Sequence, residues 1–204
     1  METTTHAVYV TDYTGAKIGM WMFLFTEILL FGGLFLLYAV YRAQHAVAFH
    51  EAAEHLQIGL GLANTIVLLT SSLTAALAVS AIQKGQKRGA LWGIGLTVVL
   101  AIVFMVNKYI EWSDHIHAGI YPGGAELLAK GHGENLFFGL YYTITGLHGV
   151  HVVAGVALLA YVYVRICRDK VNQKSFVMLE NSSLFWHLVD VIWIYLFPLF
   201  YLVT

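Results

Sequence analysis

Long apolar stretches alternate with short polar connections along this chain. Five stretches are long enough to cross a bilayer as a helix, which takes about 20 apolar residues. We expect these spans at residues 17–41, 57–82, 89–112, 135–165 and 181–203. The longest connection contains the turn signal YPGG. The pattern predicts an all-α integral membrane protein, a bundle of five transmembrane helices that forms a single domain over residues 1–204.

The composition agrees with a chain that lies mostly inside a membrane. Hydrophobic residues make up 59% of it and charged residues 11%, whereas a soluble domain has about 25% charged residues. The formal net charge of −1 gives no reason to expect a nucleic-acid partner. The start of the chain lacks the basic region and short apolar core of a cleaved signal peptide. We therefore expect insertion through the helices themselves.

The basic residues predict the orientation of the helices. They gather in the second and fourth connections, as Lys84, Lys87, Arg88, Arg165, Arg168, Lys170 and Lys174. With five spans, both connections lie on the same side as the N-terminus. The opposite side is expected to hold Arg42, Lys108 and Lys130 among several acids and histidines. Because cytoplasmic loops carry an excess of lysine and arginine, the N-terminus is predicted to be cytoplasmic.

One carboxyl group lies in the middle of the first span. Glu27 follows Lys17 by ten residues in FLFTEILLF, which places it about 15 Å along a helix. A charged group at the centre of a bilayer costs roughly 2.5–3.5 kcal/mol on insertion scales. Two interpretations remain open: a carboxyl linked to proton movement or to lipid, and a protonated acid that hydrogen-bonds to a neighbouring helix.

The fourth span contains two histidines, in the sequence GLHGVH. His148 and His151 are three residues apart, so they are expected on one face of the helix. Gly146 and Gly149 leave room beside them. Haem or metal ligation and a proton relay are possible roles. Hydrogen bonding between helices by neutral imidazoles is the interpretation we favour, because short motifs often match by chance.

The fifth span begins with WHLVD, in which His187 and Asp190 are again three residues apart. A carboxylate can orient an imidazole and fix its tautomer. The alternative is a polar patch near the membrane surface, with Trp186 as an interfacial anchor. We also expect this pair to pack against one of the titratable groups of the first or fourth span.

The third span ends in NKYIEW, where Lys108 and Glu111 are three residues apart. We expect an ion pair at the membrane interface, anchored by Tyr109 and Trp112. The histidines of the following connection have irregular spacing that fits no zinc site, so this connection is expected to be a solvated loop. No nucleophile stands beside a base in a known motif. The residues alone indicate a redox-inert subunit or a small proton-coupled carrier.

Four segments resemble, in the same order, those of subunit III of the haem–copper oxidases. They are FLFTEILLF at 23–31, ANTIVLLTSSLT at 63–74, GLHGVHVVAG at 146–155 and WHLVDVIWIYLFPLFYL at 186–202. The resemblance covers nearly the whole chain and implies a five-helix bacterial subunit of a proton-pumping cytochrome c oxidase of aerobic respiration, in the inner membrane. It implies direct packing on subunit I, a complex with subunit II and other small subunits, and bound phospholipid. Haem and copper would lie in the partner subunits and none in this chain.

The resemblance also assigns expected roles to single residues. Glu27 matches the family's buried carboxyl, which is associated with proton uptake and lipid. Five further residues match polar helix contacts: Glu111, His148, His151, His187 and Asp190. Members with seven spans have two additional helices that wall the lipid cleft, and this chain lacks them. A quinol oxidase and a nitric-oxide-reductase-associated relative stay open within the family. A haem-bearing membrane anchor and a proton-coupled transporter are the alternatives from other classes.

Overall fold

The structure of the chain, a computed structural model, describes residues 13–202, without the side chains of residues 125 and 130. Its regular secondary structure is helical, and five of the described helices are long and apolar enough to cross a membrane. These are α1 (Tyr13–Gln44), α3 (Ile58–Gln83), α4 (Lys87–His117), α6 (His132–Cys167) and α7 (Val177–Phe197), which continues as the π-helical turn η1 (Pro198–Leu202). The prediction of five transmembrane helices is confirmed.

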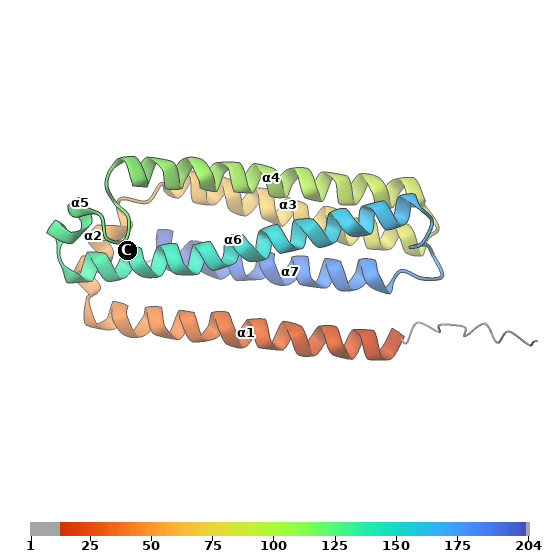
Figure 1. Cartoon of the computed structure of the whole chain (residues 1–204), viewed down its shortest axis with the longest axis horizontal. Coiled ribbons are helices and arrows are strands. Elements are labelled where there is room, and N and C mark those ends of the chain that lie inside the picture. The colour runs from red at the N-terminus through yellow and green to blue at the C-terminus, as the bar shows by residue number, and fades with distance from the viewer. Residues whose placement is uncertain (1–12, 203–204) are drawn as a thin grey trace, which may run out of the picture.

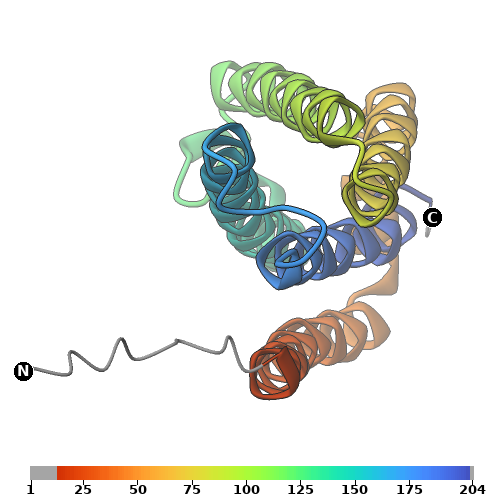
Figure 2. The same ribbon diagram turned by 90° about the vertical axis from the view of Figure 1, so that its right-hand side faces the viewer.

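Four of the long helices surround a common core, and the fifth lies outside them. The helix α3 packs on α4 and α7, and α6 packs on the same two neighbours. Among the long helices, the outer helix α1 contacts α6 and α7, along one side only (Figures 1 and 2). Because the remaining faces of α1 meet no other described helix, most of its apolar side chains are exposed. Its position on the bundle therefore depends on a few contacts.

Two short helices in the polar connections were not predicted. The helix α2 (Ala46–Ala53) follows α1, and α5 (Ala125–Lys130) lies in the connection that we expected to be a solvated loop. Each buries an apolar residue, Phe49 in α2 and Leu127 in α5. The Phe49 ring packs edge-on against Tyr38 and Phe137, with both centroid distances at 5.4 Å. This packing stabilises α2, which is too short to be a stable helix alone.

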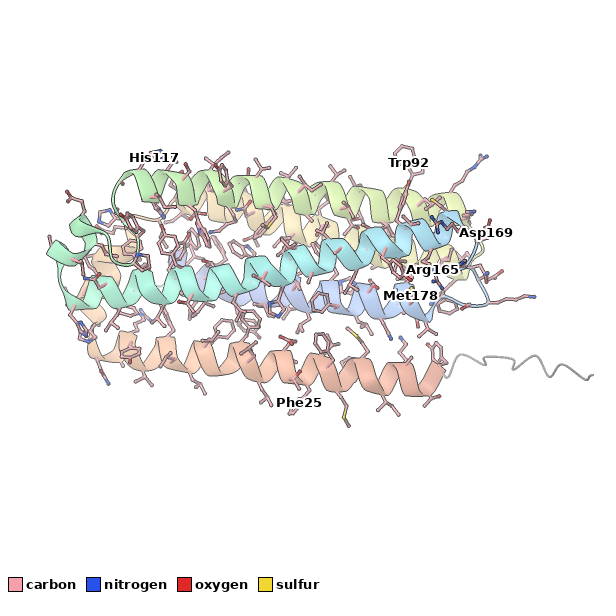
Figure 3. All side chains as sticks on the ribbon, in the orientation of Figure 1. Phe25, Trp92, His117, Arg165, Asp169 and Met178 are labelled. Atoms are coloured by element: carbon pink, nitrogen blue, oxygen red, sulfur yellow. The ribbon has the colours of Figure 1, made fainter. Side chains whose placement is uncertain are left out.

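The outer surface of the bundle is apolar over the length of the spans. Phe25 of α1 and Trp92 of α4 point away from the bundle, and they are 60% and 81% exposed (Figure 3). A soluble protein seldom exposes so large a continuous apolar surface. Lipid chains or other membrane subunits must cover it.

The basic connections lie where the sequence placed them, at the end of the bundle where α1 begins (Figure 1). An ion pair of 2.7 Å between Lys87 and Asp169 joins the two connections. One assignment of a charge to the opposite side was wrong. Lys108 is buried inside the bundle, with 8% of its surface exposed, because other buried polar groups surround its ammonium group.

Candidate functional site

Three of the polar groups inside the described bundle contain titratable residues that the sequence singled out, and each joins different helices. The first links α1 to α6, the second links α3 to α7, and the third links α4, α6 and η1. Among the described residues, no cluster of three or more histidine, cysteine or acidic side chains is placed to hold a metal ion.

Glu27 of α1 and His151 of α6 form the first group. The Glu27 Oε2 atom is 2.8 Å from His151 Nε2, and each side chain is 14% exposed. The other ring nitrogen, Nδ1, is 2.8 Å from the carbonyl oxygen of Leu147. A carbonyl only accepts, so Nδ1 carries a hydrogen. A second proton is shared between Nε2 and the carboxyl group, and the pair has no net charge whichever atom holds it.

The two histidines of α6 diverge, although the sequence placed them on one face. His151 reaches outward to α1, while His148 lies between the rings of Phe104 and Trp193, with centroids 5.8 and 5.4 Å away. His148 is 1% exposed, and neither of its ring nitrogens has a hydrogen-bond partner among the described residues. Residues three apart differ by about 60° around a helix, which is enough to direct them to different neighbours.

His187 of α7 lies between two hydroxyl groups in the second group. Its Nδ1 is 2.7 Å from Ser72 Oγ of α3, and its Nε2 is 3.1 Å from Ser183 Oγ. Orientation of this imidazole by Asp190 was one of two open interpretations, and the two hydrogen-bond partners found here are both serines. The Asp190 carboxyl is 2% exposed and lies near Ser72. The hydrogen bonds of His187 therefore go to serines rather than to another titratable group.

Lys108 and Glu111 form the predicted ion pair, but inside the bundle rather than at its surface. The Lys108 Nζ atom is 2.8 Å from Glu111 Oε2, and Glu111 is fully buried. Tyr141 of α6 and Tyr201 of η1 donate hydrogen bonds of 2.9 and 2.5 Å to Glu111 Oε1. Both hydroxyl oxygens also accept from Lys108, at 2.9 and 3.0 Å. Every charge in this network is paired, which is the condition for tolerating a buried ion pair.

The sequence did not reveal the two tyrosines of this network. Tyr141 follows Glu111 by 30 residues, and Tyr201 follows it by 90. Nothing in their local spacing distinguishes them from the interfacial aromatic residues that are common in membrane helices. Only the packing of α6 and η1 against α4 brings their hydroxyl groups to the carboxylate.

Comparison with known families gives one match over nearly the whole chain. The family model described as cytochrome c oxidase subunit III matches residues 2–204. Cytochrome c oxidase subunit 3 of Thermostichus vulcanus is 32% identical over 190 residues, which is 92% of this chain and 87% of the relative.

Two other relatives carry different names. Cytochrome bo(3) ubiquinol oxidase subunit 3 of Pseudomonas aeruginosa is 29% identical, over 90% of this chain and 83% of the relative. The haem–copper oxidase subunit I+III of Aeropyrum pernix is 28% identical, over 92% of this chain and 22% of that longer protein. Similarity therefore extends to oxidases named for different electron donors.

Proposed function

This chain belongs to the cytochrome c oxidase subunit III family, and we propose that it carries no redox centre. In this proposal it stabilises the catalytic subunit and supports the proton uptake of that subunit. Subunit III of a haem–copper oxidase is part of an oxidoreductase complex, so the chain associates with other oxidase subunits in a membrane. The observation that carries the proposal is the Glu27–His151 pair. It is a proton-sharing contact on the side of the bundle where α1 is attached.

The Glu27–His151 pair fastens the outer helix at mid-membrane depth. Towards its two ends α1 is held by the Lys17–Glu180 ion pair of 2.9 Å and by a hydrogen bond of 2.6 Å from Tyr38 to the Leu199 carbonyl oxygen. Apolar contacts lie between these ends as well, such as that between the Phe23 and Phe185 rings, 5.8 Å apart. A hydrogen bond in a low-dielectric setting is strengthened electrostatically. A group that can also take up or release a proton there couples the position of α1 to the protonation of the pair. Through this coupling, a change in the protonation of the pair would alter the hydration and the proton supply of the partner subunit.

Replacing Glu27 with glutamine tests this role in the assembled complex. The amide keeps the size of the side chain and can still donate to His151, but it cannot exchange a proton. We expect proton uptake to slow and the lifetime of the enzyme during turnover to shorten severalfold. The readouts are proton uptake, retained phospholipid and the time course of oxygen consumption. Glu126→Gln, the same change at an exposed acid, is the control. If all three readouts stay at the wild-type level, the carboxyl serves packing alone.

Haem and copper are proposed to lie in partner subunits. The three imidazoles that the sequence placed within the spans have surroundings unsuited to an axial ligand: His148 is enclosed by aromatic rings, His151 is bonded to Glu27, and His187 is bonded to serines. The purified chain, separated from its partners, should show no Soret absorption band. Stoichiometric haem on the isolated chain would instead support the haem-bearing anchor, and uptake activity of the chain in liposomes would support the transporter.

The electron donor is proposed to be cytochrome c, in agreement with the name of the Thermostichus vulcanus relative. The purified complex should consume oxygen with reduced cytochrome c and not with ubiquinol. Preference for ubiquinol would instead place the chain with the Pseudomonas aeruginosa relative. A subunit II with a dinuclear-copper motif encoded beside this chain would give the same answer from sequence.

We also propose that the chain contacts subunit I directly and binds phospholipid. In the Aeropyrum pernix relative the name subunit I+III denotes one polypeptide, which supports adjacency of the two subunits. A groove of about 360 Å³ between α1, α6 and α7 is lined mainly by apolar side chains, including Met20, Phe23, Leu158 and Phe185. It suits an acyl chain. The N-terminal end is proposed to face the cytoplasm of a bacterial cell, following the basic connections.

A further inference from the structure

A polar pocket lies between α1, α3 and α7, near the end of the bundle where α1 begins. Its volume is about 210 Å³, and it is lined by Lys17, Ala76, Val79, Glu180, Ser183, Leu184 and His187. Other grooves on the bundle are lined mainly by apolar side chains, whereas this one presents two charged groups, a hydroxyl and an imidazole. A space of this size holds several water molecules, since each needs about 30 Å³.

An ion pair stands at the mouth of this pocket. The Lys17 Nζ atom is 2.9 Å from Glu180 Oε2, and the two side chains are 24% and 13% exposed. Tyr13 and Gln83 also donate hydrogen bonds to the Glu180 carboxylate, at 2.9 and 3.3 Å. The opposite charges at the mouth offset each other. Because both side chains remain partly exposed, water reaches the pocket past them.

A chain of hydrogen-bonding groups leads inward from the pocket. Ser183 and His187 line it and are hydrogen-bonded to each other, and the Nδ1 atom of His187 is 2.7 Å from the Ser72 hydroxyl oxygen. Ser72 lies beside the carboxyl of Asp190, whose oxygens make no hydrogen bond of normal geometry to a described residue. Each intermediate group can both donate and accept.

The burial of Asp190 decides the form of its carboxyl group. It is 2% exposed, and no ion pair joins it to a described side chain. Burying an ionised carboxylate without a cationic partner is strongly unfavourable. The carboxyl therefore holds a proton at the inner end of a hydrated polar chain.

We propose that the pocket is a hydrated inlet through which the Asp190 carboxyl exchanges its proton with the aqueous phase at the N-terminal end of the bundle. One proton leaves as another arrives, so charge is conserved and no bond between heavy atoms changes. The inlet rests on the proposed function in one respect only, the assignment of this end to the side from which the oxidase takes up protons. On that side of the membrane, the protonated Asp190 carboxyl gives subunit III an internal proton store.

Infrared spectroscopy of the intact complex tests the inlet. The carbonyl stretch of a protonated carboxyl lies above the amide I band, and the difference between wild type and Asp190→Asn should reveal one such band. We expect this band to shift to lower frequency when the complex is transferred to D₂O. Absence of a protonated-carboxyl band in the difference spectrum, or a band that does not shift after prolonged incubation, would overturn the proposal.

Blocking the pocket shows whether exchange uses this route. Ala76→Leu fills the pocket from α3 without touching the polar chain, and it should slow the shift of the Asp190 band by about tenfold or more. Leu77→Phe, on the exposed side of the same helix, should leave the rate unchanged. Equal rates in the two variants would show that the proton reaches Asp190 another way. Since exchange is measured without turnover, this failure would leave the proposed function intact.

Cysteine labelling gives a second measurement that does not depend on Asp190. In a Cys167→Ser background, Ser183→Cys should react with a small charged thiosulfonate reagent, and Ala76→Leu should suppress the reaction. Thr97→Cys, fully buried between α3 and α4, should not react. A Ser183→Cys thiol as inert as that control would mean that water does not fill the pocket.

Discussion

Replacing Lys108 with methionine should lower the stability of the subunit by about 3–5 kcal/mol, the cost of breaking a buried ion pair from one side. Methionine has a similar length but leaves the Glu111 carboxylate, fully buried, without its cationic partner. The hydrogen bonds from Tyr141 and Tyr201 remain but cannot replace a full charge. Loss of subunit III from the complex on heating, compared with wild type, measures the effect.

Two further variants separate charge burial from general damage. Lys108→Met combined with Glu111→Leu removes both charges, and most of the lost stability should return, because apolar replacements of buried ion pairs are often neutral. Lys87 lies on the same helix as Lys108 and forms an exposed ion pair with Asp169 of another connection. Lys87→Met makes the same change there, and it should cost less than about 1 kcal/mol. If the double variant is as unstable as Lys108→Met, the tyrosine network rather than the unpaired charge accounts for the loss.

The five spans could be predicted because a membrane leaves the backbone few options. Without water in the bilayer core, each span must satisfy its own hydrogen bonds as a helix, so about 20 apolar residues suffice to identify it. The residues at which the helices end were less predictable. The third span was expected to end at residue 112, whereas α4 continues to His117, because helices extend past the hydrocarbon into polar residues. The helix α2 depends on Phe49 packing on Tyr38, which no local pattern shows.

Among the buried polar groups, local spacing predicted one contact and failed for another. Lys108 and Glu111 are three residues apart and do meet, since both point into the same core. His187 and Asp190 have the same spacing, but the described hydrogen bonds of His187 go to Ser72 of another helix and to Ser183. A spacing of three residues predicts that two side chains lie close together on one helix. Which partner each side chain bonds to depends on the neighbouring helices.

Contacts between helices that are far apart in the chain could not be predicted from a single sequence. Glu27 and His151 were each identified as buried titratable groups, but they are 124 residues apart. Hydrogen bonding of Glu27 to a neighbouring helix was one of two open interpretations. Its partner could have been any polar group at the same depth, because nothing in the sequence alone states which helices adjoin. The packing of α1 against α6 selects His151.

Replacing Gly93 with leucine should disrupt the closest helix pair in the bundle. A Cβ atom at Gly93 of α4 would lie 2.8 Å from the Cβ of Ala78 and 2.9 Å from the carbonyl oxygen of Thr74. The second contact is with backbone, which cannot rotate away. Small residues let membrane helices approach closely, and overpacking such a contact typically costs about 1–3 kcal/mol. Leucine, which adds three carbons beyond Cβ, should reach at least the upper end of that range.

Gly95 of the same helix provides the matched control. A Cβ atom there would have only the Tyr163 ring near it, at 3.9 Å, so Gly95→Leu should be tolerated. Both changes add the same side chain and the same helix propensity, and their difference reports the contact between α3 and α4. Retention of subunit III in the purified complex and its dissociation temperature are the measurements. If Gly93→Leu and Gly95→Leu dissociate at the same temperature, α3 and α4 are not held together by this close approach. The Thr74–Thr97 hydrogen bond of 2.7 Å would then be the contact that fixes their spacing.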